Sequence, residues 1–320
     1  DADGAEADKA VMRKLFSVAL LLVAVVAFVA GVMIMKPGLR TKWYFAADRT
    51  WTSHWPLPRG NGIIRDLKPL IRPTAPAWVT IEPSVTMLLD PEDYVSNEIL
   101  RTGRWEHESW EAIRPYLPQD AVFVDVGAHI GYYSLKAAAV LGPRGRVIAV
   151  EPNPPTVREL RDNIAASNAA HVHVYPVACS DKESTLVLYA APRANTGQSS
   201  LSRANAGQEG AVAAEYKVPA RPLDAIVLED GVRRVDVIKV DVEGAEMLVM
   251  RGAGWTLDRF HPVVMVELIE KQLQAMGTST AEVRAFFAAH GYVERVAITD
   301  NVVFGWKDSG TGDARPAGTD

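Results

Sequence analysis

The residues with the clearest chemical potential lie between Val122 and Glu151. An apolar run ends on Asp125, a turn with two glycines, Gly127 and Gly131, follows it, and a second apolar run ends on Glu151. This order predicts a strand, a turn, a helix and a second strand, with free backbone N–H groups of the helix facing the space above the sheet. A carboxylate at the tip of the second strand can accept hydrogen bonds from both hydroxyls of a ribose. The pattern therefore predicts a nucleoside-cofactor site.

The spacing within this turn separates the candidate cofactors. A dinucleotide site needs the turn Gly-x-Gly-x-x-Gly, whereas this chain has Asp-x-Gly-x-x-x-Gly with Ala128 and His129 in its middle. An Asp just before the turn repels phosphate and suits a cation such as the amino group of a methionine moiety. The chain also has no P-loop motif. These features favour S-adenosylmethionine, although for the turn alone an ordinary αβ crossover remains the alternative.

A second group of chemically active residues lies at the end of another apolar run. If this strand end is extended, its period of two places Lys239, Asp241 and Glu243 on one side. Such a group can polarise and deprotonate a hydroxyl, and methyl transfer to a hydroxyl needs alignment and a base. Asp241 is the candidate base, with Glu243 or Glu246 next. For Glu246 the alternative is a carboxylate that stabilises the first turn of a helix.

No metal site is expected at these acids. The histidines His171 and His173 belong to an earlier strand and are typical of solvent-side or core positions. Glu267 lies near the end of the next apolar run and is expected at the same rim of the sheet.

Five segments together resemble the FkbM family of S-adenosylmethionine-dependent methyltransferases. They are Gly103–Glu106, Val124–Ser134, Val150–Pro154, Asn195–Leu201 and Val237–Glu246, which occur in the family's order. The resemblance extends from about Met87 to Ile269. His129 is a departure, because the family more often has Asn there, but imidazole can also donate or accept a hydrogen bond.

The resemblance implies an α/β, Rossmann-like class I methyltransferase fold with a mostly parallel seven-stranded sheet, helices on both faces and one antiparallel strand. It also implies which residues bind the cofactor. The methionine side is assigned to Asp125, Gly127, Ala128, His129 and Gly131, the ribose to Glu151 with Asn153 beside it, and the adenine side to Ala178, Ser180 and Asp181. The acceptor class that it implies is a sugar, a glycan or another hydroxylated small molecule.

The elements that must position these residues follow from the apolar pattern. Short β-branched runs predict buried parallel strands at Val122–Val126, Val147–Glu151, Val172–Val177, Val235–Asp241 and Val263–Leu268. Helical periodicity is found at Thr156–Ser167 and Ala281–His290, and a terminal hairpin is expected from Tyr292–Ile298 and Asn301–Trp306. The loop Asn195–Leu201 and the polar stretch Gln208–Ala214 are either a lid over the site or plain surface loops.

The N-terminal part has a different composition. Leu15–Met35 carries no charge and, at about 1.5 Å per residue, is long enough to cross a hydrocarbon core of about 30 Å. A retained membrane anchor is expected over a cleavable signal peptide, because no small-x-small site follows the run. The basic residues after the span slightly outnumber those before it, which places the bulk of the chain in the cytoplasm. The aromatic residues that follow (Trp43, Tyr44, Phe45, Trp51 and Trp55) are either an interfacial belt or a docking surface for another membrane protein.

These boundaries divide the chain into five parts. They are a charged tail (1–14), a membrane helix (15–35), an aromatic segment with a Pro-rich extended linker (36–78), the methyltransferase-like domain (79–307) and a disordered tail (308–320). The net charge of −5 argues against nucleic acid as a partner. The single cysteine, Cys179, excludes an internal disulfide.

The sequence therefore predicts a membrane-anchored S-adenosylmethionine-dependent methyltransferase that acts on a hydroxylated acceptor. The alternative is a methyltransferase-like fold kept as a docking subunit of a membrane complex, with integral membrane partners bound through Leu15–Trp55. The partners expected in the first case are the acceptor and the lipid bilayer.

Overall fold

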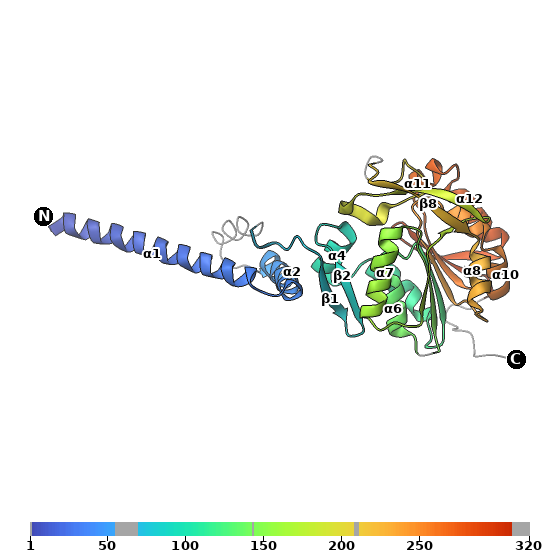
Figure 1. The fold of residues 1–320 in the computed structure, drawn as a ribbon, viewed down its shortest axis with the longest axis horizontal. Helices are drawn as coiled ribbons and strands as arrows, with labels where there is room; N and C mark the ends of the chain where they lie inside the picture. Colours follow the sequence, from blue (N-terminus) through green and yellow to red (C-terminus); the bar gives the residue numbers. More distant parts are fainter. Residues whose placement is uncertain (1, 55–69, 143, 208–210, 309–320) are drawn as a thin grey trace.

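The computed structural model describes residues 2–54, 70–142, 144–207 and 211–308. Most of the expected Pro-rich linker and the expected disordered tail lie outside these residues. Within them, a long N-terminal helix projects away from a rounded α/β domain (Figure 1).

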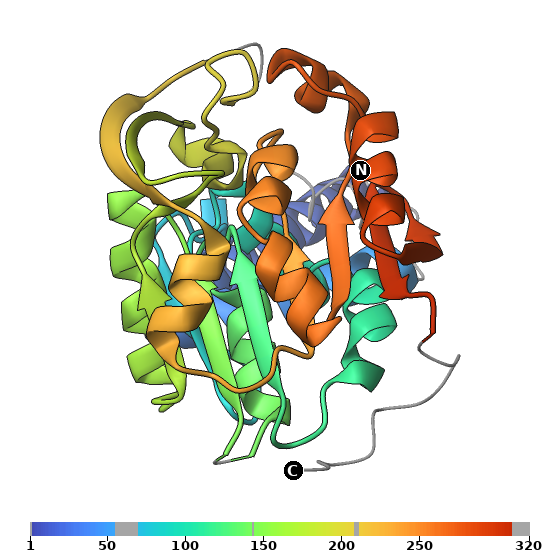
Figure 2. The same cartoon turned by 90° about the vertical axis from the view of Figure 1, so that its right-hand side faces the viewer.

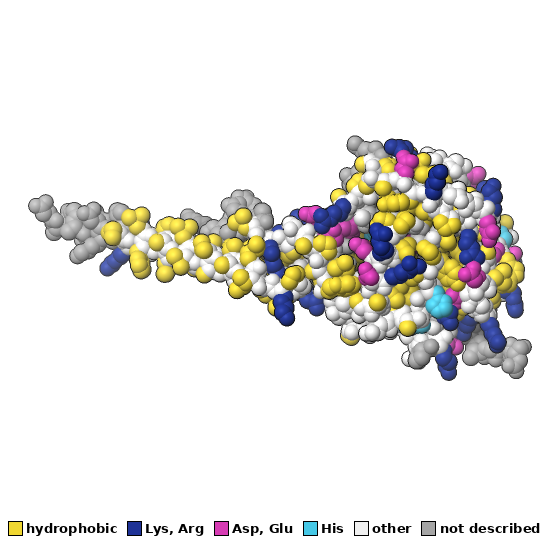
Figure 3. Space-filling view, in the orientation of Figure 1, with side chains coloured by type: hydrophobic (Ala, Val, Ile, Leu, Met, Phe, Trp, Pro, Cys, Tyr) yellow, Lys and Arg dark blue, Asp and Glu magenta, His cyan; other side chains and the backbone are white. Residues whose placement is uncertain are grey.

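From Met12 onward, the described side chains of the N-terminal helix α1 (Ala2–Met33) form a largely apolar surface (Figure 3). Large side chains such as Phe16, Val23 and Val26 are more than half exposed. The part Met12–Met33 is long and apolar enough to cross a membrane, a criterion that a signal sequence near an N-terminus also meets. Only 6% of this apolar stretch is buried, so the described part of the chain leaves its apolar surface uncovered.

The next helix, α2 (Pro37–His54), packs against the domain instead of standing free. Tyr44 and Phe45 are buried, with 7% and 4% of their surface exposed, and Arg40 Nη2 donates to the carbonyl oxygen of Ile71 at 3.2 Å. These two aromatics therefore belong to an internal core and are not available as an interfacial belt or a docking surface. Trp43 packs edge-on against Phe28 of α1. The side chains of Trp51 and Trp55 lie outside the described part.

The central sheet has seven strands, in the order β11-β12-β10-β9-β3-β4-β5. The strands are β3 (Val122–Val126), β4 (Arg146–Val150), β5 (Val172–Tyr175), β9 (Val237–Val240), β10 (Val263–Glu267), β11 (Tyr292–Ile298) and β12 (Asn301–Trp306). Only β12 runs antiparallel to its neighbours in this sheet, β10 and β11, with which it forms the terminal hairpin expected from the sequence. The expected fold class, a mostly parallel Rossmann-like sheet with one antiparallel strand, is confirmed.

Helices cover both faces of this sheet (Figure 2). Along β3, successive side chains point to opposite faces of the sheet. Val124 contacts the core that includes Leu223 and Phe287, whereas Phe123 contacts the core that includes Trp110 and Leu135. A strand buried on both faces needs apolar residues at every position, which explains the continuous apolar runs. Asp125 is the exception on β3, and it lies on the same face as Phe123.

The helices of the domain occur in three sequence regions. Before β3 lie α4 (Tyr94–Thr102), α5 (His107–Ile113) and the 3₁₀ turn η1 (Arg114–Tyr116). Between β3 and β8 lie α6 (Tyr132–Val140), α7 (Pro154–Ala166) and the 3₁₀ segment η2 (Arg193–Gln198). After them come α8 (Leu223–Asp230), α9 (Glu246–Arg251), α10 (Gly254–Phe260), α11 (Glu270–Ala275) and α12 (Thr280–Ala289).

Two small sheets were not expected from the sequence. One is the hairpin of β1 (Ala77–Glu82) and β2 (Val85–Leu89), which packs near α7. The other joins β6 (Ala178–Cys179), β8 (Ala214–Arg221) and β7 (Ser184–Ala190). This second sheet carries η2 and the residues after it toward the carboxyl ends of the central strands.

Candidate active site

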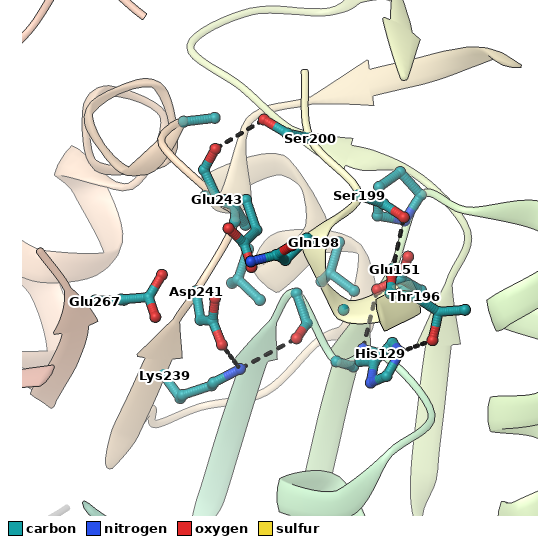
Figure 4. Close-up of a pocket in the computed structure, with 18 of the residues that line it drawn as sticks. His129, Glu151, Thr196, Gln198, Ser199, Ser200, Lys239, Asp241, Glu243 and Glu267 are labelled. Atoms are coloured by element: carbon teal, nitrogen blue, oxygen red, sulfur yellow. Dashed lines mark hydrogen bonds and ion pairs between the residues drawn. The ribbon is translucent and has the colours of Figure 1, made fainter. Parts of the chain in front are cut away.

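A cavity of about 360 Å³ lies at the carboxyl ends of the central strands. Its wall includes the last residues of β3, β4 and β10, namely Val126, Val150 and Glu267, together with Asp241 just after β9. The loop from Asn195 to Leu201 closes it from the opposite side. This volume falls in the range of about 300–1,000 Å³ typical of small-molecule sites. Figure 4 shows how the polar side chains of the wall converge on the space.

Glu151 lies at the end of β4 and is held by two backbone donors. His129 N–H donates to Oε2 at 2.9 Å and Asn153 N–H donates to Oε1 at 2.9 Å. Burial raises the pKa of Glu151 to about 7, although these hydrogen bonds favour the ionised form. The carboxylate therefore lies in the wall in a fixed orientation, with lone pairs left to accept hydroxyl donors.

The turn after β3 forms the neighbouring wall. Gly127 and Ala128 both donate their N–H groups to the carbonyl oxygen of Val150, at 2.9 and 3.0 Å. Gly127 has φ of +78°, and a Cβ at this position would lie 1.8 Å from the carbonyl oxygen of Asp241. Glycine is thus required because the turn packs directly on the chain after β9. That contact brings the two predicted halves of the site together.

Gly127→Ala is expected to destabilise the protein by more than about 3 kcal/mol, because a left-handed backbone and an impossible contact both oppose the Cβ. Gly103→Ala is the matched control, since Gly103 has φ of +82° but open space around its Cβ position. It should cost only about 1–2 kcal/mol. Urea unfolding of both variants measures the difference, and equal losses would show that the packing contact is unimportant.

His129 connects this turn to the loop that covers the cavity. Its Nε2 lies 2.8 Å from Thr196 Oγ1, and the N–H and hydroxyl of Thr196 both donate to Asp93 Oδ1, at 3.0 and 2.9 Å. Asp93 also caps α4 by accepting from Ser96 N–H. The Asn195–Leu201 loop therefore lies over the site, which favours the lid hypothesis over a plain surface loop for this segment. Residues 208–210 of the second polar stretch lie outside the described chain.

The Lys239 ammonium organises the other end of the cavity. Its Nζ lies 3.1 Å from Asp241 Oδ2 and donates to the carbonyl oxygen of Gly127 at 3.1 Å, as Figure 4 shows. Burial favours the neutral amine, but the carboxylates of Asp241 and Asp125 outweigh this effect and raise the pKa of Lys239. The lysine is therefore charged and fixed beside Asp241. In this position it can orient Asp241 as a proton acceptor.

Asp125 does not line the cavity. It is fully buried behind Lys239, where Ser134 Oγ donates to Oδ2 at 2.6 Å and Lys239 Nζ lies 3.7 Å from Oδ1. The sequence-based assignment of this carboxylate to the methionine amino group is therefore not carried forward. Asp125 lies on the face of β3 that packs against α6, and its effect on the site passes through Lys239.

Four other predicted cofactor residues also lie off the cavity wall: Gly131, Asn153, Ser180 and Asp181. Gly131 starts α6 and packs against Leu160, whereas Asn153 positions Glu151 through its N–H. Ser180 is buried and Asp181 is exposed. The predicted wall residues that the structure does bring together are Gly127, Ala128, His129, Glu151, Ala178, Lys239, Asp241 and Glu243.

The expectation that Glu243 continues an extended strand is wrong, because its φ is +56°. Its side chain still reaches the cavity, where burial and the Asp241 charge raise its pKa to about 9. Glu246 is not a wall residue; its Oε1 accepts the N–H groups of Val242 and Gly244, as expected for a carboxylate at a helix start. Cys179 lies in the wall, and burial raises its pKa to about 12, so it is a neutral thiol.

Several wall residues were not selected from the sequence. Glu106 accepts the hydroxyl hydrogen of Tyr133 at 2.9 Å, and Trp105 packs edge-on against Tyr94 of α4. The signal for Trp105 and Glu106 was present in the segment Gly103–Glu106. Gln272 had no such signal, because α11 approaches the site only through the tertiary fold.

The strand order and the cavity at the carboxyl strand ends define a Rossmann-like, class I methyltransferase fold. Residues 125–294 match the family described as the methyltransferase FkbM domain. The chain therefore belongs to the FkbM methyltransferase domain family, as the sequence resemblance implied.

Three relatives illustrate the extent of the similarity. The chain is 33% identical over 42% of its length to the AMB antimetabolite synthetase AmbE of Pseudomonas aeruginosa, of which the match covers 8%. It is 27% identical, again over 42% of its length, to Methyltransferase 1 of Beauveria bassiana, of which the match covers 59%. A methyltransferase FkbM structure from Methylobacillus flagellatus aligns with a TM-score of 0.40 and 17% identity, over 66% of this chain and 52% of that chain. The matches thus span less than two thirds of these proteins, and the family assignment supports a methyltransferase enzyme.

Proposed function

We propose that this chain is a membrane-anchored S-adenosylmethionine-dependent methyltransferase that methylates an oxygen of a sugar, glycan or other hydroxylated small molecule, lipid-linked acceptors included. The observation that carries the proposal is the single cavity in which Glu151 and the Lys239–Asp241 pair face the same space. The first group has the chemistry to bind a ribose, and the second has the chemistry to accept a proton.

The wall residues fit the cofactor. Glu151 offers a fixed carboxylate to ribose hydroxyls, and the turn of Gly127, Ala128 and His129 lies beside it. Ala178 and Val177 add an apolar wall next to β4 for an adenine ring. When bound, S-adenosylmethionine supplies a methyl group on a sulfonium, which is transferred by in-line displacement.

The chain's own residues would then prepare the acceptor. Asp241 accepts the hydroxyl proton, and the Lys239 ammonium, 3.1 Å from Asp241 Oδ2, holds the carboxylate in place. The Asn195–Leu201 loop excludes water from the space above them. The aromatic rings of Tyr94, Trp105 and Tyr132 provide apolar surface for the body of the acceptor.

The anchor belongs to the same proposal. The apolar helix Met12–Met33 would cross the bilayer, and α2, packed on the domain, would hold the catalytic part at the membrane surface. The slight excess of basic residues after the span, which include Lys36, Arg40 and Lys42, favours a domain on the cytoplasmic side, where S-adenosylmethionine is made. Burial of Tyr44 and Phe45 within the chain favours this anchored enzyme over a docking subunit.

The proposal is tested by transfer of a radiolabelled methyl group. Membranes that contain the full chain should incorporate label from S-adenosylmethionine into a lipid or glycan fraction, and the label should resist mild base as an ether does. The chain should stay in the membrane fraction after alkaline carbonate washing. Label found only in base-labile esters or in protein would contradict the acceptor class, and release by carbonate would contradict the anchor.

A further inference from the structure

Three carboxylates, two from the connection between β9 and α9 and one from β10, meet at the acceptor end of the cavity. Asp241 follows β9, Glu243 lies in the turn before α9, and Glu267 ends β10. Each offers an oxygen that lies within 4.8 Å of the others, and all three line the cavity. Figure 4 shows the side chain of Glu267 directed toward Asp241.

Two carboxylate oxygens in this region have no protein partner among the described residues. Oε2 of Glu267 is buried and accepts no hydrogen bond, and the same is true of Oε2 of Glu246, a residue that is only 1% exposed. A buried carboxylate oxygen without a partner is costly, because the lost hydration is not replaced. The charge of Glu246 acts directly on Glu267, so both orphaned oxygens belong to one acidic neighbourhood.

Among the described residues, Lys239 is the cationic side chain beside these acids, and its contacts are already made elsewhere. It pairs with Asp241 Oδ2 and donates to the carbonyl oxygen of Gly127. Glu243 is instead oriented by Gln272, whose amide donates to its Oε2. No lysine or arginine of the described residues forms an ion pair with Glu243 or Glu267, so these crowded carboxyl groups lack a protein counter-charge within the cavity.

We propose that Asp241, Glu243 and Glu267 bind one divalent cation, Mg²⁺ or Mn²⁺, at the acceptor end of the cavity. An all-oxygen set of carboxylates suits such hard cations. The ion neutralises the crowded acids, and Gln272 fixes the orientation of one ligand as outer-shell partners do. Its remaining positions face the cavity, where water or an acceptor oxygen can coordinate. No metal is expected here from the sequence, whereas the fold brings Glu267 of β10 to the two acids that follow β9.

The role of the ion rests on the proposed function. A hydroxyl oxygen bound to a divalent cation becomes more acidic, which assists removal of its proton next to Asp241. The binding of the ion itself depends only on the three carboxylates, so it is measured without any acceptor.

The test is titration of the full chain in detergent micelles with Mn²⁺, followed by the electron paramagnetic resonance signal of the free ion. We expect one Mn²⁺ per chain, displaced by Mg²⁺ but not by methylammonium. Glu267→Gln and Glu243→Gln should each weaken binding by more than about tenfold. Glu111→Gln, an exposed acid on α5, is the matched control and should leave binding unchanged.

The outcomes separate this inference from the proposed function. Absence of stoichiometric Mn²⁺ binding, equal displacement by methylammonium, or unchanged binding in both folded variants would overturn the metal site. Calorimetric titration of the same samples with S-adenosylmethionine reports on the cofactor separately. Cofactor binding without Mn²⁺ binding would therefore refute the metal site alone. Circular dichroism establishes that each variant is folded.

Discussion

Glu151→Gln is expected to weaken the binding of S-adenosylmethionine by about 100-fold at pH 8. The carboxylate at the end of β4 can accept hydrogen bonds from both ribose hydroxyls, and each such bond to a charged acceptor contributes about 1.5–3 kcal/mol. The amide retains the shape of the side chain but loses the charge and one acceptor. A loss of about 2.7 kcal/mol corresponds to 100-fold in Kd. Isothermal titration calorimetry of the full chain in detergent measures it.

The same residue predicts a dependence of affinity on pH. Because burial raises the pKa of Glu151 to about 7, the free protein holds this group protonated below that pH. Cofactor affinity should therefore increase as the pH rises from 6 to 8 in the natural protein and change much less in Glu151→Gln. Ionisation of this buried carboxyl group destabilises the free protein. The loss of stability begins as the pH rises past the ordinary pKa of 4.5 and is complete above about pH 7. If the affinity of the natural protein for S-adenosylmethionine does not change with pH, Glu151 does not contact the ribose.

Asp241→Asn is expected to lower kcat by about 10²–10⁴-fold, the range for loss of a positioned general base. Its affinity for S-adenosylmethionine should change by less than about threefold, because Glu151 and the turn after β3 are intact. Asn keeps the volume of the side chain, so the neighbouring Lys239 remains in place. The kcat of the variant relative to that of the natural protein is measured as methyl transfer at saturating cofactor. The acceptor used is the fraction that the natural protein labels.

Asp181→Asn is the matched control for that substitution. Asp181 was assigned to the cofactor from the sequence, but it is exposed and lies off the cavity wall. Its variant should keep kcat within about twofold. If Asp181→Asn loses as much activity as Asp241→Asn, the cavity described above is not the place of the reaction.

The strands of the central sheet were predictable because burial on both faces leaves long apolar runs. The range of β3, Val122–Val126, and both strands of the terminal hairpin agree with the sequence-based ranges. The small sheets were missed for a physical reason: β7 and β8 are half exposed, and their alternating burial leaves no continuous apolar run. The burial of Tyr44 and Phe45 depends on contacts with a distant part of the chain, which local composition does not report.

The candidate site was predictable where it lies close to strand ends. Glu151, Lys239 and Asp241 follow from the rule that ligands bind at the carboxyl ends of parallel strands. Asp125 shows the limit of that rule, because the alternation along β3 directs its side chain into the packed face, away from the cavity. Glu267, which was expected at the same rim, does line the cavity, whereas Gln272 reaches it only when α11 folds against the chain after β9.

The most direct test of the central claim is calorimetric titration of the full chain in detergent micelles with S-adenosylmethionine. The account predicts one site per chain with a micromolar Kd, which is weakened about 100-fold in Glu151→Gln and retained in Asp241→Asn. If a folded chain, verified by circular dichroism, shows no binding heat over a range of temperatures, the cavity does not hold this cofactor. The anchored docking subunit would then be the better explanation of the fold.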